Sequence, residues 1–411
     1  MRFITCIILT LSAAAPLVFS EGGIDWVHLS SKKSDLPEPG GSNQQTGLLA
    51  AKLSKTPAID FVISYRVKGP ALVWYQRQAN RWIRYVIENE ALPLEAGGCA
   101  HDIDEDGDLD IVWGGDAQSE QMWWWENPYP KFDADTPWKR RVIKNSGARQ
   151  HHDQIFADVL GRGKPQLIFW NQQAKSLFLA EIPPDPRNAG PWPLKTIYSG
   201  PAGEGVENAA QYAEGIDAID VDGDGRVNLL AGNSWFKHLE GDKFQAIKVS
   251  RLGGRIRGGR FKPGKHPQIV IAPGDGNGPL RLYECQDNAT DPSCWKSRDL
   301  LDRDMVRGHT LDIGDIDGDG HLDIFAAEMA KWTNKAAEPD NPRATAWILF
   351  GDGKGDFFKT VLTTGDGWHE GKLADADGDG DLDVINKPYT WEAPRIDVWL
   401  NNGTGRLRKG R

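Results

Sequence analysis

The stretch from Trp368 to Trp391 reads WHEGKLADADGDGDLDVINKPYTW, and it decides the fold. It begins with polar residues, continues into a short strand-like run, and then forms a loop with aspartate at its first, third, fifth and ninth positions. A glycine follows the fifth position, and the apolar pair Val384-Ile385 follows the loop. Two short apolar runs on either side of an acidic turn are typical of a β-hairpin. We interpret this stretch as the inner half of one blade of a β-propeller.

The same layout recurs along the chain, and internal repetition at this spacing indicates a propeller or a solenoid. Three further acidic loops begin at Asp102, Asp220 and Asp315. The first two intervals between loops are about twice the length of a blade, so each should contain a degenerate copy. Residues 158–168 and 260–270 provide these copies, and residues 48–63 have the same rhythm without the acidic loop. The sequence therefore predicts seven units.

Each unit continues with two more strand-like runs, for example 71–75 followed by 82–86. Four short strands with Gly, Asn and Asp turns make one propeller blade. The last unit is short of a full fourth strand, and residues 24–29 resemble the fourth strands of other units. We therefore predict an all-β, seven-bladed propeller of four-stranded blades over residues 21–411, with the N-terminal strand closing the ring and protecting the sheet edges.

Residues 1–20 have the features of a secretory signal peptide: Arg2, an apolar run from Ile4 to Val18, and a small-residue cleavage pattern. The run is too short for a membrane span, and no later stretch is apolar enough to be one. The protein is therefore expected to be secreted. In an oxidising compartment, Cys285 and Cys294 are expected to form a local disulfide, and Cys99 to be a buried free thiol.

The formal net charge is −10, and the acidic residues are concentrated in the loops, where bound cations would neutralise them. No basic stripe suggests a nucleic-acid partner. The oligomeric state is left open.

Oxygen ligands at the first, third, fifth and ninth loop positions can surround one hard cation, and the glycine permits the tight turn. These loops are not EF-hands, because they join two strands and lack the glutamate at position twelve. We expect structural Ca²⁺, with Mg²⁺ as the alternative. The predicted calcium ligands are Asp102, Asp104, Asp106 and Asp110; Asp220, Asp222, Asp224 and Asn228; Asp315, Asp317, Asp319 and Asp323; and Asp375, Asp377, Asp379 and Asp383.

A second pattern lies six residues before the first loop position of four units, where the sequence has His152, Glu214, His309 and His369. This position starts the innermost strand, so repeat geometry should bring the four side chains together at the mouth of the central channel. Converging imidazoles and a carboxylate favour a transition metal, with zinc held by the three histidines as the main candidate. Ordinary hydrogen bonding at strand starts is the alternative interpretation.

The strand ends should lie on the same face as these residues. Aromatic faces stack on sugar rings, and amide or charged groups bind hydroxyls. The predicted substrate-binding residues are Trp113, Trp170, Trp235, Lys387, Tyr389, Trp391 and Arg257. The alternatives are that the tryptophans pack between blades and that the arginine is solvated.

The acidic-loop repeats resemble the FG-GAP/VCBS family of secreted propellers over nearly the whole mature chain. A narrower resemblance is to the propeller domain of the fungal aldos-2-ulose dehydratases (1,5-anhydro-D-fructose dehydratases). It rests on residues 211–215 (QYAEG), 308–310 (GHT), 368–371 (WHEG) and 386–389 (NKPY). This resemblance implies a zinc-dependent sugar dehydration site. The chain lacks the cupin and lectin domains of those enzymes, so their isomerising activity is not implied.

Two functions follow from these patterns. The first is a secreted lyase in which zinc acidifies a C–H bond next to a sugar carbonyl or carboxylate, and Glu214, Glu370 or Tyr212 removes the proton. Dehydration of a keto- or anhydro-sugar is the main form, and a polysaccharide lyase is the nearest variant. The second is a non-catalytic, calcium-binding propeller that adheres to glycan or protein. Adhesion needs the acidic loops but not the converging histidines.

Overall fold

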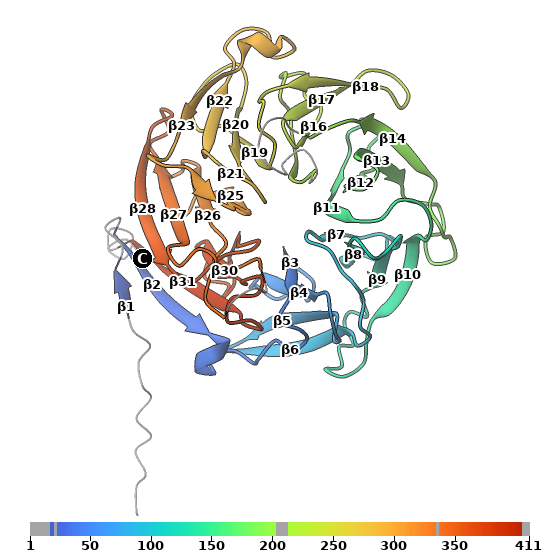
Figure 1. The fold of residues 1–411 in the computed structure, drawn as a ribbon. Helices are drawn as coiled ribbons and strands as arrows, with labels where there is room; N and C mark the ends of the chain where they lie inside the picture. The colour runs from blue at the N-terminus through green and yellow to red at the C-terminus, as the bar shows by residue number, and fades with distance from the viewer. Residues whose placement is uncertain (1–16, 20–22, 203–212, 334–336, 405–411) are drawn as a thin grey trace, which may run out of the picture.

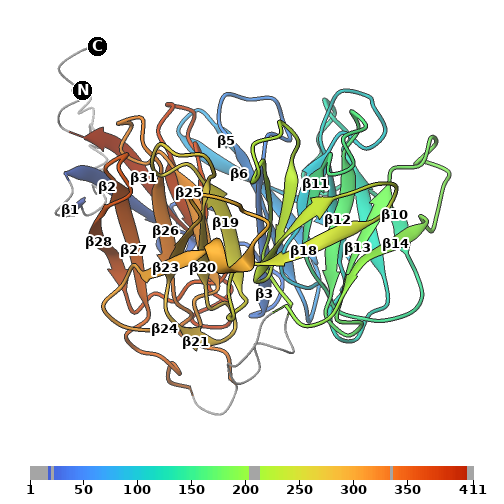
Figure 2. The same cartoon turned by 90° about the horizontal axis from the view of Figure 1, so that it is seen from above.

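The computed structural model describes residues 17–19, 23–202, 213–333 and 337–404. Antiparallel sheets are arranged around a central axis like the blades of a propeller (Figure 1). Within these ranges, seven of the eight sheets are blades, and the eighth is a two-stranded ribbon of β21 (Asn277–Gly278) and β24 (Met305–Val306). Viewed edge-on, this ribbon lies at one face of the ring (Figure 2). The predicted all-β, seven-bladed propeller is confirmed.

Each blade runs from an inner strand at the channel to an outer strand at the circumference. Blade 1 contains β3 (Gln45–Ala51), β4 (Asp60–Tyr65), β5 (Leu72–Gln78) and β6 (Arg81–Glu88). Blade 2 contains β7 (Cys99–His101), β8 (Asp110–Gly114), β9 (Met122–Glu126) and β10 (Lys139–Lys144). Blade 3 contains β11 (His151–Ala157), β12 (Gln166–Asn171), β13 (Ser176–Glu181) and β14 (Leu194–Ser199). Blade 4 contains β15 (Ile216–Ile219), β16 (Asn228–Ala231), β17 (Ser234–His238) and β18 (Phe244–Lys248).

Blade 5 contains β19 (Arg255–Gly259), β20 (Gln268–Ala272), β22 (Arg281–Glu284) and β23 (Lys296–Asp299). Blade 6 contains β25 (Thr310–Gly314), β26 (Asp323–Ala327), β27 (Thr345–Gly351) and β28 (Phe357–Thr364). Blade 7 contains β29 (Lys372–Ala374), β30 (Asp383–Asn386), β31 (Asp397–Thr404), β2 (Ile24–Ser30) and β1 (Leu17–Phe19). The helical elements of the described residues are two 3-10 turns, η1 (Ser31–Lys33) and η2 (Pro292–Cys294).

The two ends of the chain meet in blade 7. Strand β2 pairs antiparallel with β31, from Ile24 opposite Thr404 to Ser30 opposite Asp397. Figure 1 shows these two strands side by side although they lie at opposite ends of the sequence. The predicted closure of the ring by the N-terminal strand is confirmed.

The hydrophobic core is divided into clusters that lie between neighbouring blades. One cluster joins strands of blades 1 and 2 and includes Trp74, Trp113 and Trp125. Another joins blades 6 and 7 and includes Trp26 from β2. Each buried aromatic side chain contributes on the order of 2–3 kcal/mol through area removed from water. Inter-blade packing therefore holds the inner strands, and the residues that start them, in fixed positions around the axis.

Cysteine placement agrees with the sequence expectations. Cys285 and Cys294 form a disulfide across nine residues of sequence, which supports an oxidising environment. Cys99 is a buried free thiol, and burial raises its pKa far above the usual range. No helix among the described residues is long and apolar enough to cross a membrane.

Candidate functional site

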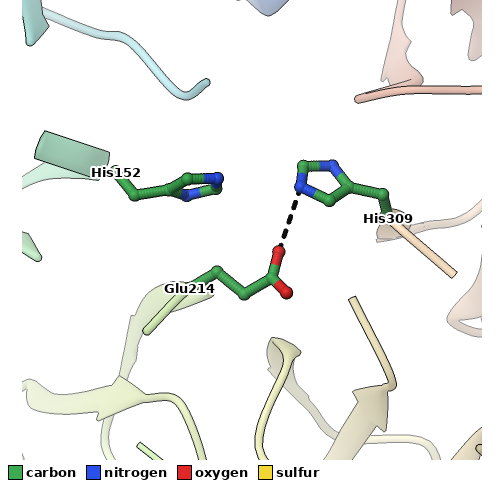
Figure 3. Close-up of side chains that lie close together, drawn as sticks. All are labelled: His152, Glu214 and His309. Carbon is green, nitrogen blue, oxygen red and sulfur yellow. Dashed lines mark ion pairs between the residues drawn. The ribbon is translucent and has the colours of Figure 1, made fainter. Parts of the chain in front are cut away.

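The inner strands of three blades bring His152, Glu214 and His309 together beside the channel axis. One nitrogen or oxygen atom of each residue lies within 4.8 Å of the others. All three side chains are buried. Nε2 of His309 is 3.0 Å from Oε2 of Glu214, and the His152 and His309 rings meet edge to face with centroids 5.6 Å apart. Figure 3 shows both imidazoles and the carboxylate pointing toward one another.

This group fits a transition metal. Two ligands bonded at about 2.0–2.1 Å around one ion are separated by roughly 3 Å, which is the separation of the His309 and Glu214 atoms. Two imidazoles and one carboxylate are also a ligand set that zinc uses. Oε2 of Glu214 contacts Nε2 of His309, whereas the other ring nitrogen of His309, Nδ1, is buried without a hydrogen-bond partner. The convergence that the sequence register predicted is therefore present for these three residues.

His369, the fourth residue of the register, lies beside the group. Its ring stacks on that of His309 with centroids 4.1 Å apart and an interplanar angle of 10°. Nζ of Lys387 is 2.6 Å from Nδ1 of His369 and donates to the carbonyl of Gln45 at 2.9 Å. The contact occupies Nδ1, so Nε2 is the nitrogen of His369 that remains for exchange with a ligand.

The electrostatics of the site separate the roles of its residues. Burial disfavours the charged form of His152, but Asp153 outweighs it and raises the pKa of the imidazole to about 9. Burial also opposes the charge on Glu214, yet the nearby His309 holds the pKa of the carboxyl below its ordinary value. Burial and then Lys387 lower the pKa of His369 well below its ordinary value. Near neutral pH the metal-free site therefore holds a protonated His152 and an ionised Glu214 beside a neutral His369, and a bound metal would have to displace the proton from His152.

Glu370 does not have the role that the sequence suggested. Its carboxylate is buried, pairs with Arg255 at 2.9 Å, and accepts hydrogen bonds from the backbone N–H groups of Leu48 and Gly97. Burial opposes its charge, but Arg255 lowers its pKa to about 2. A carboxylate held so firmly in its charged, hydrogen-bonded state is a poor general base, and the expectation that Glu370 removes a proton is corrected.

Three tryptophans predicted to bind substrate are fully buried between blades. Their indole N–H groups donate to backbone carbonyls: Trp113 to Glu95, Trp170 to Gly215 and Trp235 to Ala289. Their faces are covered by the inter-blade cores, so the expectation that they stack on a ligand is corrected.

Lys387 is also fully buried, and its contacts with His369 and Gln45 replace the substrate contact that we expected.

The other predicted substrate residues differ in their surroundings. Tyr389 is partly exposed, its ring is 5.2 Å from that of His369, and its hydroxyl bonds Gln44 and Arg66. Trp391 is also partly exposed. Arg257 lies farther along β19, where it bonds backbone carbonyls and approaches Asp312 at 3.4 Å. Tyr212 lies outside the described residues.

The four acidic loops each gather three carboxylates within 4.8 Å. The sets are Asp102, Asp104 and Asp106; Asp220, Asp222 and Asp224; Asp315, Asp317 and Asp323; and Asp375, Asp377 and Asp383. Buried carboxylate oxygens without hydrogen-bond partners occur at Asp104, Asp222 and Asp377, as expected of cation ligands. These sets fit Ca²⁺. Asp110, Asp319 and Asp379 lie outside these sets, the side-chain oxygen of Asn228 accepts the backbone N–H of Val221, and calcium binding itself stays a prediction.

Sequence reasoning did not identify the partners behind the histidines, and it placed Lys387 among the substrate-binding residues. Asp153 accepts a hydrogen bond from Nδ1 of His152 at 3.0 Å, and Lys387 contacts His369. Asp153 directly follows a register histidine, so its position was a usable signal. Lys387 directly follows β30 and lies 18 residues after His369, so their contact could be recognised only once the fold was known.

A sequence model described as an FG-GAP-like repeat matches residues 315–385. These residues run from the acidic loop of blade 6 to β30 of blade 7 and include two acidic loops. This stretch is an FG-GAP-like repeat. The inner pair of strands and the turn that joins them also occur, with variation, in the other blades. No curated protein sequence matches the chain.

Solved structures of similar shape include three proteins of low sequence identity. Rhamnogalacturonan lyase YesW has 11% identity and a TM-score of 0.42, covering 96% of this chain and 75% of its own. The V. cholerae biofilm matrix protein Bap1 has 9% identity, a TM-score of 0.45 and 89% coverage of both chains. Bacillus licheniformis rhamnogalacturonan lyase PL11 has 11% identity and a TM-score of 0.45, and the match covers 95% of this chain and 75% of the lyase. Likenesses of this size do not bear on what the protein binds or catalyses.

Proposed function

We propose that this protein is a secreted lyase that eliminates water from a keto- or anhydro-sugar at the mouth of the propeller channel. One observation carries the proposal: two buried imidazoles and a carboxylate from three blades converge beside a neutral imidazole. Imidazole and carboxylate atoms buried this close together on three different blades form a ligand set that zinc uses.

The proposed zinc ligands are His152, Glu214 and His309. This set exchanges His369 for Glu214 relative to the three histidines expected from the sequence, because Glu214 lies in the converging group and Nδ1 of His369 contacts Lys387. Zinc bound here would polarise a sugar carbonyl and acidify the adjacent C–H bond.

His369 is the proposed proton acceptor. Burial keeps its imidazole neutral, and the Lys387 contact at Nδ1 fixes the orientation of the ring. A neutral imidazole in a fixed orientation can take up the C–H proton at Nε2 as the C=C bond forms and the neighbouring C–O bond breaks, and it can return that proton to the departing hydroxyl, which leaves as water. General acid–base catalysis of this kind typically contributes 10²–10⁴-fold to a rate. Tyr389, partly exposed and next to His369, would contact the sugar.

Secretion is part of the proposal. The N-terminal signal pattern and the disulfide between Cys285 and Cys294 support it. A carbohydrate partner follows from the proposed reaction.

The test combines metal content with activity. Purified protein is analysed for zinc by mass spectrometry and assayed with keto- and anhydro-sugars by absorbance of the unsaturated product. About one zinc per chain is expected. Glu214→Gln should lose both zinc and activity. His369→Gln should keep zinc but lose at least about 10²-fold in rate. His266→Gln is the matched control, because His266 is a buried histidine that bonds backbone carbonyls between blades 4 and 5.

An active protein without zinc would refute the proposed metal centre. Calcium alone, with glycan binding and no turnover, would replace the lyase by the adhesion function.

A further inference from the structure

Arg255 lies at the start of β19 and is buried among the residues of the site, with 4% of its side chain exposed. Its Nη1 contacts both carboxylate oxygens of Asp153 at 2.8 and 2.7 Å, and its Nη2 contacts Glu370 at 2.9 Å. One guanidinium from blade 5 thus joins carboxylates from blades 3 and 7. Each of these carboxylates directly follows a histidine of the site.

The backbone at both carboxylates has an unusual conformation. Asp153 has φ of 43° and Glu370 has φ of 63°, in the left-handed region that non-glycine residues seldom adopt. Such conformations persist where surrounding contacts determine them. Here the ion pairs with Arg255 supply those contacts, and they turn both carboxylates toward the guanidinium.

Asp153 transmits this arrangement to two of the proposed zinc ligands. Its Oδ2 accepts a hydrogen bond from Nδ1 of His152 at 3.0 Å, which leaves Nε2 facing the site. The same oxygen accepts the backbone N–H of Gly215 at 2.7 Å, and Gly215 directly follows Glu214. Asp153 therefore fixes the ring of His152 and the backbone that carries Glu214.

Glu370 performs the corresponding task for the opposite side. Its Oε2 accepts the backbone N–H groups of Leu48 and Gly97, each at 3.1 Å, so it links blade 7 to blades 1 and 2. Because Glu370 follows His369 directly, this anchoring holds the backbone that presents His369 to the site.

We propose that Arg255 is the positioning residue of the centre, and this inference rests on the proposed function. Through Asp153 it aligns His152 and Glu214, and through Glu370 it holds His369. The planar guanidinium can bind two carboxylates at once in fixed geometry, whereas the ammonium of lysine is a point donor. Arg255 needs no contact with substrate, because both of its terminal nitrogens bind the protein.

The test measures zinc affinity by competition with a chelating dye, together with thermal stability, in the full-length protein. Arg255→Lys is expected to weaken zinc binding by at least about tenfold, as is typical when groups behind metal ligands are altered. Arg257→Lys is the matched control, because Arg257 lies in the same strand but contacts Asp312 and backbone carbonyls. It should leave zinc affinity unchanged.

Asp153→Asn provides a second variant that keeps the side-chain volume and an acceptor for His152 but removes the ion pair with Arg255. It should also weaken zinc binding by about tenfold or more. This variant decides the question if Arg255→Lys does not fold. Zinc affinities equal to that of Arg257→Lys in either folded variant would overturn the inference.

A readout without metal separates this inference from the proposed function. In ¹⁵N-histidine-labelled, metal-free protein, the bonded Nδ1–H of His152 should give a protected signal that Arg255→Lys loses and Arg257→Lys keeps. If the wild-type protein binds no zinc, the metal centre fails, and this signal still tests Arg255. Unchanged imidazole spectra in Arg255→Lys would overturn the positioning role.

Discussion

Only glycine fits at position 274, because the carboxylate of Glu214 occupies the space that a side chain would need. A Cβ at this position would lie 1.9 Å from Oε1 of Glu214, and φ is +61°. The neighbouring backbone N–H of Asp275 donates to the same oxygen at 2.7 Å. One glycine after β20 in blade 5 therefore determines where a carboxylate of blade 4 can point.

Replacing Gly274 with alanine should displace the Glu214 carboxylate and weaken zinc binding by at least about tenfold. Gly241→Ala is the matched control, because Gly241 has φ of +58° and an alanine Cβ there would have no heavy atom within 4 Å. Both variants incur about 1–2 kcal/mol of backbone strain. Dye competition for zinc and urea unfolding measure the two effects separately. Equal zinc affinity in the two variants would contradict this assignment.

At the scale of the element, the turn between the first two strands of each blade contains a hydrogen bond that does not depend on metal. The side chain at the ninth loop position accepts a hydrogen bond from a backbone N–H at the second or third position. The pairs are Asp60 with Ser54, Asp110 with Ile103, Gln166 with Leu160, Asn228 with Val221, Gln268 with Phe261, Asp323 with Ile316, and Asp383 with Ala376. This shared bond explains how blades 1, 3 and 5 form the same turn without an acidic loop.

Asp60 makes this bond in blade 1, and burial raises its pKa to about 6 despite its bonds to Ser54. The folded state then holds the proton more tightly than the unfolded state, whose pKa is about 3.9. The associated stability is present at low pH and is lost as the pH rises from about 4 to 6, by roughly 3 kcal/mol. Asp60→Asn lacks this loss, so its stability relative to wild type should rise between pH 4.5 and 7 in urea unfolding. A constant difference would show that Asp60 does not titrate in this range.

The elements were predictable from sequence because strand alternation and turn residues are local signals. Partners were not. The sequence showed Glu370 as an acid beside a histidine, but only the fold places Arg255 against it. Trp113 lies near the end of β8, and its burial depends on the facing blade. The converging residues could be predicted because they share one register position, which the symmetry of the ring carries to one point.

At the scale of the whole molecule, the acidic loops add charge that cations must balance. In blade 2, a guanidinium nitrogen of Arg187 lies 2.8 Å from Asp104 and 2.9 Å from Asp106. Lys237 pairs with Asp222 in blade 4. In these two loops, side-chain cations neutralise part of the carboxylate charge. The loops of blades 6 and 7 lie in the matched FG-GAP-like repeat.

Removing calcium with EGTA should lower the melting temperature, and added Ca²⁺ should restore it. Binding at 100 times Kd contributes about 2.7 kcal/mol per site. Asp377→Asn should reduce the calcium response, because Asp377 belongs to the carboxylate set of blade 7. Differential scanning calorimetry with and without EGTA measures the shift. A melting temperature independent of calcium would mean that the loops are stable through their own hydrogen bonds and ion pairs.

The pairing of β2 with β31 also sets an order of events during synthesis. Strand β2 is made first and must remain without its partner until β31 has been made, 369 residues later when counted from His28 to Asp397. Until then, β2 would have an open edge and the buried Trp26 would lack its cluster around Trp399. Contacts between such distant segments form slowly, and open strand edges favour aggregation. Completion of blade 7 is therefore the step at which a newly made chain is most exposed to misassembly.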